Sequence, residues 1–320
     1  MQSPRPRSSR LRRVLRAAGL AVACPVLLVL LNEYAFTSGT RARGGELKAI
    51  PVPAYAAARG GERDVKIMAY NIAKAFVNED MPRFTERSTV VARLDRIADV
   101  IRAESPDLVF LSEVVWETPY NSVNQVRHLA SACGFRYYAF GENSNVGLPF
   151  FRYVGGNAIL SRWPLYNGDN PDLPGRQPFW VTRNNRRVLM ADADIDGARV
   201  RCIAAHFDSF QLDNNLRQVR RILDGLDGWP TLVAGDFNAW PGTPSMRAWA
   251  ESGRFSGSIN GPHTFPADKP DRRIDYVLAP REWRELSHHT TGGGASDHLA
   301  VVSVFRFRPS TALLVDADGS

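Results

Sequence analysis

Two polar side chains close a short apolar stretch in the second half of the chain. Residues 231–240 have the sequence TLVAGDFNAW, in which small or apolar residues precede Asp236 and Asn238. This pattern predicts a buried strand, and the spacing of two puts both polar side chains on one side of an extended backbone. Open α/β sheets hold their ligands at the carboxyl ends of such strands. A lone aspartate after a strand is more often a turn former or helix cap. The pair therefore indicates a ligand site only if other strands end in the same way.

Several other apolar stretches also end in, or contain, a polar group. These groups are Asn71, Glu113, His206, Asp275 and the pair Asp297 and His298. Carboxylates, amides and imidazoles are the groups that metal-assisted phosphate chemistry requires. An isolated histidine is more often a hydrogen-bonded core residue, which is how we interpret His128, His263, His288 and His289. His206 and His298 differ because each lies at a strand boundary close to a carboxylate.

Alternating strands and helices must position these groups. Helical periodicity is found at residues 88–103, 122–133, 215–226 and 245–251. Strand-like stretches are found at residues 64–72, 107–113, 135–140, 157–161, 188–195, 200–205, 231–235, 273–278 and 299–307. This order favours two packed mixed sheets covered by helices. We see no repeat and no break within residues 63–309, which we predict to be one catalytic domain, with residues 310–320 as a tail.

The first 36 residues predict a targeting segment. An apolar run from Ala17 to Leu31 follows a basic stretch that ends at Arg16. Fifteen helical residues span about 22 Å, which suits a signal peptide better than a membrane span of roughly 30 Å. No convincing cleavage site follows, so removal and retention as an anchor, with membrane association through residues 14–36, both stay open. Either fate exports residues 37–320, because the positive end stays inside.

The basic charge of the chain also comes from this beginning. Residues 1–43 contain eight arginines and one acid, and subtracting them from the 40 basic and 33 acidic residues of the whole chain leaves 32 of each. Bulk charge therefore gives no argument for or against a polyanionic partner. Residues 37–62 are rich in Gly, Ala, Pro and Arg and predict a flexible linker. Cys133 and Cys202 could pair after export, but two cysteines define no disulfide framework.

Seven short motifs together resemble the endonuclease/exonuclease/phosphatase superfamily in order and spacing. They are AYN at 69–71, LSE at 111–113, GNAILS at 156–161, AH at 205–206, GDFN at 235–238, RIDY at 273–276 and SDH at 296–298. The resemblance covers roughly residues 63–307. It implies the deoxyribonuclease-I-like fold, an α/β (α+β) four-layer sandwich of two mixed β-sheets flanked by helices, which bacterial sphingomyelinases share. It also implies hydrolysis of a phosphodiester or phosphomonoester by an activated water, with Mg²⁺, Mn²⁺ or another divalent cation.

The resemblance assigns roles to individual residues. Glu113 would be the main metal ligand, with Asn71 beside it and Asp297 close by. Asp236 would orient or deprotonate the attacking water, and Asn238 would hold a phosphoryl oxygen. Such a site acts by positioning the water and stabilising charge during in-line displacement.

The two histidines would contact the phosphate from opposite sides. His298 would face it with Asp275 bonded to its other ring nitrogen, and His206 would approach from the other side. Asn157 would help to orient the site. Ala73 stands where members specialised for abasic DNA carry an acidic residue, so we do not expect that repair role.

Two loops favour different phosphoesters. Residues 148–153 (LPFFRY) suit a lipid interface, although the same side chains could pack in the core. Residues 179–187 combine two aromatic residues with Arg183 and further arginines, which suits a nucleic-acid strand or, equally, a solvated strand edge. Nucleic acid and phospholipid therefore both stay candidates, and no protein partner is evident. The alternative of a different class is a catalytically silent binding domain on the same scaffold.

Overall fold

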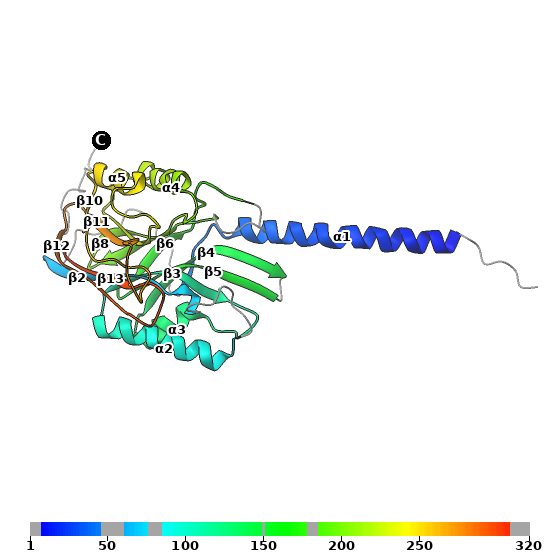
Figure 1. Cartoon of the computed structure of the whole chain (residues 1–320), viewed down its shortest axis with the longest axis horizontal. Coiled ribbons are helices and arrows are strands. Elements are labelled where there is room, and N and C mark those ends of the chain that lie inside the picture. The colour runs from blue at the N-terminus through cyan, green and yellow to red at the C-terminus, as the bar shows by residue number, and fades with distance from the viewer. Residues whose placement is uncertain (1–7, 46–60, 76–84, 149–150, 178–184, 308–320) are drawn as a thin grey trace, which may run out of the picture.

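The computed structural model describes residues 8–45, 61–75, 85–148, 151–177 and 185–307, and within them two β-sheets pack face to face between outer helices (Figure 1). The larger sheet has the strand order β1-β4-β5-β3-β2-β13-β12. Its strands are β1 (Arg43–Gly45), β2 (Arg63–Asn71), β3 (Leu108–Glu117), β4 (Tyr137–Leu148), β5 (Phe151–Ser161), β12 (Arg284–Thr291) and β13 (Ala300–Phe307). Only β2 and β3 pair in parallel, so the sheet is mixed.

The smaller sheet has the order β10-β11-β9-β8-β7-β6. Its strands are β6 (Leu165–Asp169), β7 (Leu189–Ile195), β8 (Ala198–His206), β9 (Thr231–Asp236), β10 (Phe255–Ser256) and β11 (Asp275–Pro280). Here β8 and β9 form the parallel pair. Each sheet therefore has one pair of neighbouring strands that end on the same side.

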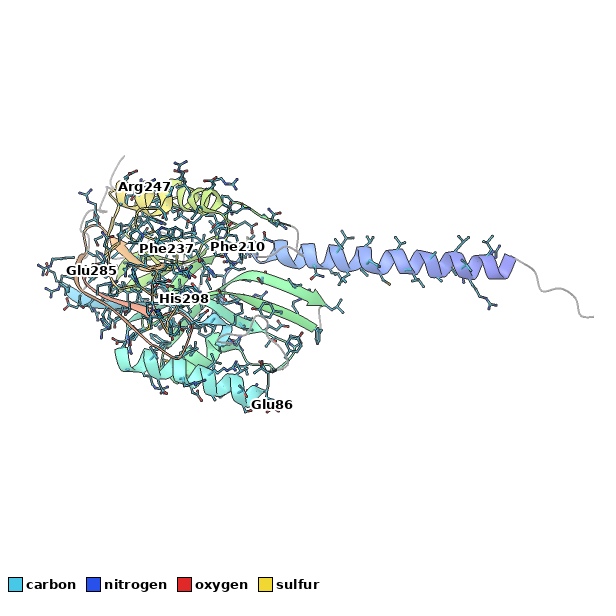
Figure 2. All side chains as sticks on the ribbon, in the orientation of Figure 1. Glu86, Phe210, Phe237, Arg247, Glu285 and His298 are labelled. Carbon is cyan, nitrogen blue, oxygen red and sulfur yellow. The ribbon has the colours of Figure 1, made fainter. Side chains whose placement is uncertain are left out.

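The helices cover the two outer faces. They are α2 (Arg87–Glu104), α3 (Gln125–Ala132), α4 (Leu212–Asp224) and α5 (Pro244–Glu251), with a short 3₁₀ helix η1 (Ala73–Ala75). One apolar cluster joins α2 and α3 to the larger sheet, a second lies between the sheets, and a third joins α4 and α5 to the smaller sheet. Figure 2 shows Glu86 and Arg247 at these two outer layers, with His298 between them. The four-layer fold predicted from the sequence is confirmed.

Alternation along the strands decides which side chains face the gap between the sheets. On β2, Val65, Ile67 and Ala69 belong to the cluster between the sheets, whereas Met68 and Tyr70 pack against the helices. Asn71 continues the inward series, as its period of two predicts. The same alternation on β8, β9 and β11 turns His206, Asp236 and Asp275 toward the gap.

The predicted elements differ from the observed ones mainly at their ends. Strands β6, β10 and β12 were not predicted, because none has a clear apolar alternation. Strand β10 has only two residues, and β12 is exposed or half-buried along its length. The first helical turn at 122–124 is missing from α3, which begins after Asn124 caps the amide of Arg127. Cys133 and Cys202 are both free thiols, in different apolar clusters, and are not joined by a disulfide.

The chain begins with helix α1 (Ser8–Ser38), which projects away from the domain (Figure 1). Its segment Leu11–Asn32 is long and apolar enough to cross a membrane by length and composition, a test that a signal sequence near the start of a chain also passes. This segment has 22 residues, or about 33 Å of helix, and is longer than the apolar run read from the sequence. Strand β1 lies inside the predicted linker 37–62 and pairs with β4.

Candidate active site

Four strand ends from the two sheets meet at one edge of the sandwich. The parallel register places Asn71 of β2 beside Ser112 of β3, and His206 of β8 beside Asp236 of β9. The Ser112 hydroxyl donates to the backbone oxygen of Ala205 at 3.3 Å and so links the two sheets. Polar groups from distant parts of the chain therefore share one edge.

The Asp236 carboxylate is the centre of this edge and is almost completely buried. Its Oδ2 accepts a hydrogen bond from Asn71 Nδ2 at 3.0 Å, and its Oδ1 accepts one from the backbone N–H of Asn238 at 2.9 Å. Gly235 has a φ of 138° and lies so close to the backbone of Ala205 that no side chain would fit there. A glycine is therefore required directly before this aspartate.

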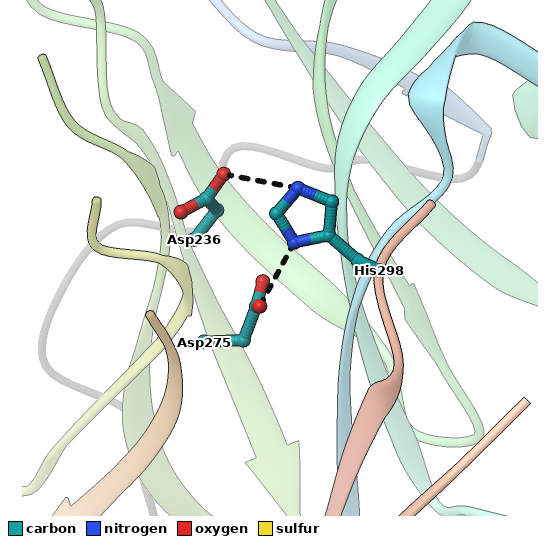
Figure 3. Close-up of side chains that lie close together, drawn as sticks. All are labelled: Asp236, Asp275 and His298. Atoms are coloured by element: carbon teal, nitrogen blue, oxygen red, sulfur yellow. Dashed lines mark hydrogen bonds and ion pairs between the residues drawn. The ribbon is translucent and has the colours of Figure 1, made fainter. Parts of the chain in front are cut away.

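His298 and Asp275 form a buried pair next to Asp236 (Figure 3). His298 Nδ1 and Asp275 Oδ2 are hydrogen bonded at 2.9 Å, and His298 Nε2 lies 3.9 Å from Asp236 Oδ2. Phe265 packs against the imidazole, with the ring centroids 4.6 Å apart. The ring orientation is thus fixed by a carboxylate on one side and an aromatic face on the other.

His206 lies between Asp236 and Glu113. Its Nε2 is 3.5 Å from Asp236 Oδ2, 4.0 Å from Glu113 Oε1 and 3.3 Å from Arg186 Nη2. Burial, and next the charge of Arg186, lower the pKa of His206 well below its ordinary value. His206 is therefore neutral near pH 7, and its Nε2 can accept the hydrogen bond from the guanidinium.

Glu113 reaches this edge only because β3 is irregular. Two residues, Ser112 and Glu113, oppose the single residue Asn157 of β5, which is a β-bulge. Glu113 has a φ of 55°, in the left-handed region that non-glycine residues rarely adopt. In a regular strand the residue after inward-facing Ser112 would point to the helices. The bulge re-aims Glu113 toward His206, and strained residues of this kind cluster at functional sites.

Charge around the carboxylates sets their pKa values in opposite directions. Burial alone would raise the pKa of Glu113, but the charge of Lys74 and its hydrogen bond to the carboxylate lower it to about 2. Burial, together with the charge of Asp275, raises the pKa of Asp236 to about 7. Glu113 is therefore ionised at neutral pH, whereas Asp236 can exchange a proton there.

The charge on His298 follows from its carboxylate neighbours. Burial would lower the pKa of His298, but Asp275, and next Asp236, raise it to about 10. His298 is therefore an imidazolium at neutral pH, and its Nε2–H is available as a donor. The Asp275 oxygen that does not contact His298 is buried without a hydrogen-bond partner.

The structure brings most of the predicted site residues together. Asn71, Glu113, His206, Asp236, Asn238, Asp275 and His298 are linked by the contacts above or by a shared neighbour. The Asp297 carboxylate accepts from Ser296 Oγ at 3.3 Å and helps to raise the pKa of Tyr70 after burial, so its charge reaches the same edge. Asn157 is fully buried, and its amide contacts Ala204 O and Asn143, below the bulge. Arg183 lies outside the described residues.

The geometry at Asn238 differs from the sequence expectation. Strand β9 ends at Asp236, and Asn238 has a φ of 49°, so the backbone between them is not extended. The Asn238 side chain donates to Phe207 O at 3.1 Å, and the residue stays partly exposed. Asn238 lies near Asp236 because a tight turn returns its amide to the carboxylate, not because of the period of two.

Sequence reasoning missed several residues that shape the site. Lys74 forms an ion pair with Glu113, and Ser296 Oγ donates to Asn71 O at 2.7 Å. Thr264 Oγ1 accepts from the backbone N–H groups of Ile274 and Asp275. Lys74 lies three residues after the AYN motif and Ser296 belongs to the SDH motif, and these positions are the signal that could have identified them. No local signal exists for Thr264 and Phe265, which reach the site from an irregular loop.

The donor set suits a hard divalent cation. Glu113 is ionised and half-buried, buried Asn71 offers an amide oxygen, and Lys74 already places a positive charge beside Glu113. Within the described part of the chain, the ligand-type atoms of Asp236, Asp275 and His298 also lie within 4.8 Å of one another. In that group Asp275 keeps His298 protonated through their hydrogen bond, and an imidazolium cannot bind a metal, so we regard it as an acid–base group.

Comparison with known proteins decides the family. The profile of the endonuclease/exonuclease/phosphatase family matches residues 68–298, which include every site residue described above. The chain belongs to this family. Proteins of the endonuclease/exonuclease/phosphatase family generally hydrolyse phosphoesters, usually with a divalent metal.

Individual relatives agree with this assignment. The chain is 26% identical over 248 residues to the uncharacterized protein YbhP of Escherichia coli K12, covering 70% of this chain and 92% of YbhP. A solved family member from Beutenbergia cavernae is 27% identical, covers 77% of this chain and 72% of its own, and has a TM-score of 0.58. Sphingomyelinase C from Streptomyces griseocarneus is 17% identical over 76% of this chain and 99% of its own, with a TM-score of 0.54, and shows the shared fold.

The positive φ of Glu113 predicts that glycine and alanine variants differ in stability in opposite directions at two adjacent positions of the bulge. Glu113→Gly should be more stable than Glu113→Ala by about 1 kcal/mol, because glycine adopts a positive φ without strain. At Ser112, where φ is not positive, Ser112→Ala should be more stable than Ser112→Gly by about 0.5–1 kcal/mol. Thermal unfolding of the four variants measures both differences. The same order at both positions would contradict the bulge.

Proposed function

We propose that this protein is an exported, Mg²⁺-dependent phosphodiesterase whose water is activated at Asp236. The observation that supports this most is the contact chain from Glu113 through His206 and Asp236 to His298, which joins four distant motifs in one buried edge. A catalytically silent binding domain would have no need to bury two carboxylates and two imidazoles in contact.

The acid–base chemistry follows from the charges of these groups. Asp236, with its pKa near 7 and held by Asn71 and Asn238, accepts a proton from the attacking water. The imidazolium of His298 donates to a phosphoryl oxygen and stabilises the charge that develops there. Asp275 holds the opposite ring nitrogen and keeps His298 protonated.

The remaining residues bind and orient the phosphate. Neutral His206, positioned by Arg186, faces it from the side opposite His298. Glu113 and Asn71, with Asp297 close by, would hold Mg²⁺. When bound, the cation would polarise a phosphoryl oxygen and offset negative charge on the phosphate. Displacement is in line: the water oxygen bonds to phosphorus while the bond to the leaving alcohol oxygen breaks.

The substrate class is a phosphodiester of a phospholipid or a nucleic acid. Exposed Phe151, from the stretch that could equally have packed in the core, favours a lipid substrate. The sphingomyelinase C fold is compatible with the same choice. Half-buried Arg186 beside His206 suits the phosphate of either substrate. Phe150 and the aromatic pair at 179–180 lie outside the described residues. Comparing sphingomyelin, single-stranded DNA and RNA side by side distinguishes the two classes.

We also propose that α1 is kept as a membrane anchor, with the domain outside. The apolar side chains of Leu11–Asn32 are not buried against the domain, so they need lipid around them. The end of α1 docks on β4 through a 2.8 Å hydrogen bond from Gly147 N to Asn32 Oδ1. The arginines before the span favour an inward amino terminus.

Loss of the acid–base groups should abolish phosphodiester hydrolysis. We expect His298→Ala and Asp236→Ala each to lower kcat on bis(p-nitrophenyl) phosphate with Mg²⁺ by about 10²–10⁴-fold. His289→Ala is the matched control, because this ring lies on the edge strand β12 and pairs with Glu104 of α2. Chelation by EDTA should remove the activity, and Mg²⁺ should restore it. Equal rates for His298→Ala and His289→Ala would contradict the assignment.

Lys74 should compete with the cation for Glu113. Its ammonium pairs with the carboxylate that we assign to Mg²⁺, so removing the charge should favour the metal. We expect Lys74→Met to lower the Mg²⁺ concentration at half-maximal activity, measured by metal titration. Lys66→Met, which loses an ion pair at Glu104 on the other side of the sheet, is the control and should leave that concentration unchanged. A higher requirement in Lys74→Met would contradict competition.

Retention of α1 predicts an intact amino terminus. Expressed in a bacterium with its own leader, the protein should be found in the membrane fraction. Its intact mass should include residues of the Leu11–Asn32 span, since cleavage would remove the docked end of α1. A soluble product that begins after Ser38 would overturn the anchor and leave the enzymatic proposal untouched.

A further inference from the structure

The β4–β5 hairpin carries an exposed apolar tip. Phe151 is 48% exposed and Tyr120 is 37% exposed, and their rings pack edge to face with centroids 5.8 Å apart. Leu148, the last residue of β4, pairs with Phe151 at the end of the hairpin. We call Tyr120, Leu148 and Phe151 the tip surface. Trp116 and Arg152 line a shallow pocket beside it, and aromatic and basic residues of this kind are typical of the lipid headgroup level.

The tip surface lies where the apolar span of α1 ends. Asn32 is the last residue of that span, and it accepts a hydrogen bond from the backbone of Gly147, one residue before Leu148. Figure 1 shows α1 continuing beyond the hairpin in the direction in which β4 runs. A membrane that surrounds Leu11–Asn32 would therefore end at the level of the tip surface.

The segment after α1 holds the helix to the domain. Asn170 Nδ2 donates to Gly39 O at 2.8 Å, and Arg43 Nη2 pairs with buried Glu142 at 2.7 Å. Glu142 also pairs with buried Arg187 at 3.2 Å. A side chain at Gly39 would collide with both of these groups. With β1 paired to β4, this docking leaves the helix little freedom to swing relative to the hairpin.

The hairpin and the catalytic edge point the same way. Strand β4 runs in the direction of β3, because both pair antiparallel to β5. The bulge of β3 lies level with Gly156, and the hairpin continues from there to Phe151, five residues or roughly 17 Å further. Contact of the tip with a surface would turn the catalytic edge toward that surface at about this distance.

We propose that the tip surface rests on the lipid surface of the membrane that α1 spans, and so holds the catalytic edge facing that membrane. The inference rests on the proposed retention of α1 as an anchor. It does not depend on which phosphodiester is cleaved. The hairpin is a second, reversible contact, and its apolar side chains enter the headgroup region next to the helix.

Fluorescence quenching in vesicles tests this contact. The full chain with Cys24→Ser receives Phe151→Cys or, as the matched control, Leu286→Cys, each labelled with a thiol-reactive NBD dye. Leu286 is another exposed apolar residue, and its neighbour Glu285 lies at the end of the domain far from α1 (Figure 2). The Cys24→Ser protein without a new cysteine serves as a blank, because it measures how much dye reacts with half-buried Cys133. The vesicles contain phosphatidylcholine and phosphatidylglycerol, with or without a lipid bearing a headgroup nitroxide.

The nitroxide lipid should cause a loss of NBD emission at position 151 and none at position 286. Unquenched emission at 151 in chains that float with the vesicles overturns the tip contact while the anchor stands. Equal quenching at both positions also overturns it, because the domain would then lie on the bilayer without a fixed face. Chains that do not float overturn the anchor and this inference together. Hydrolysis of a soluble phosphodiester is measured separately and bears only on the enzymatic proposal.

Discussion

The structure depends on burying two carboxylates beside each other between two sheets. Asp236 and Asp275 face each other across the antiparallel pair of β9 and β11, and both are removed from water. An isolated buried carboxylate is costly, so each needs donors or a positive partner. His298 serves both, and Asn71 and the Asn238 amide satisfy Asp236. Burial, together with the remaining repulsion from Asp275, raises the pKa of Asp236 to a value suitable for proton transfer.

This arrangement explains why the surrounding backbone is unusual. Gly235 allows β9 to approach β8 closely, and the turn after Asp236 returns the Asn238 amide to the carboxylate. The bulge in β3 supplies Glu113 on the same side as its neighbour Ser112. The turn adds the Asn238 amide to the edge and the bulge adds the Glu113 carboxylate, whereas regular strands would place neither group there. Backbone strain near the site is thus part of how the charges are satisfied.

A second group of charges, of which Glu142 and Arg187 are buried, serves a different purpose at the base of the β4–β5 hairpin. Glu142, Arg187 and Arg43 connect the chain after α1 to β4 and to the loop before β7. Buried ion pairs add little net stability, but they specify geometry when both partners are present. Here that geometry is the angle between α1 and the hairpin. The catalytic edge and the tip of the hairpin therefore lie toward the same end of the larger sheet.

The sequence by itself determined the layers, the inward-facing residues and the family. Apolar periods of 2 and 3.6 predicted most of the sandwich, and the period of β2 correctly turned Asn71 inward, because regular elements obey local rules. Glu113 was found by its motif, yet its direction could not be read from alternation. Lys74, Arg186, Thr264 and Phe265 acquired their places only in the folded chain. Irregular backbone and contacts between distant segments depend on which sheets pack together, so the tertiary structure alone decided the bulge, the charges at the site and the docking of α1.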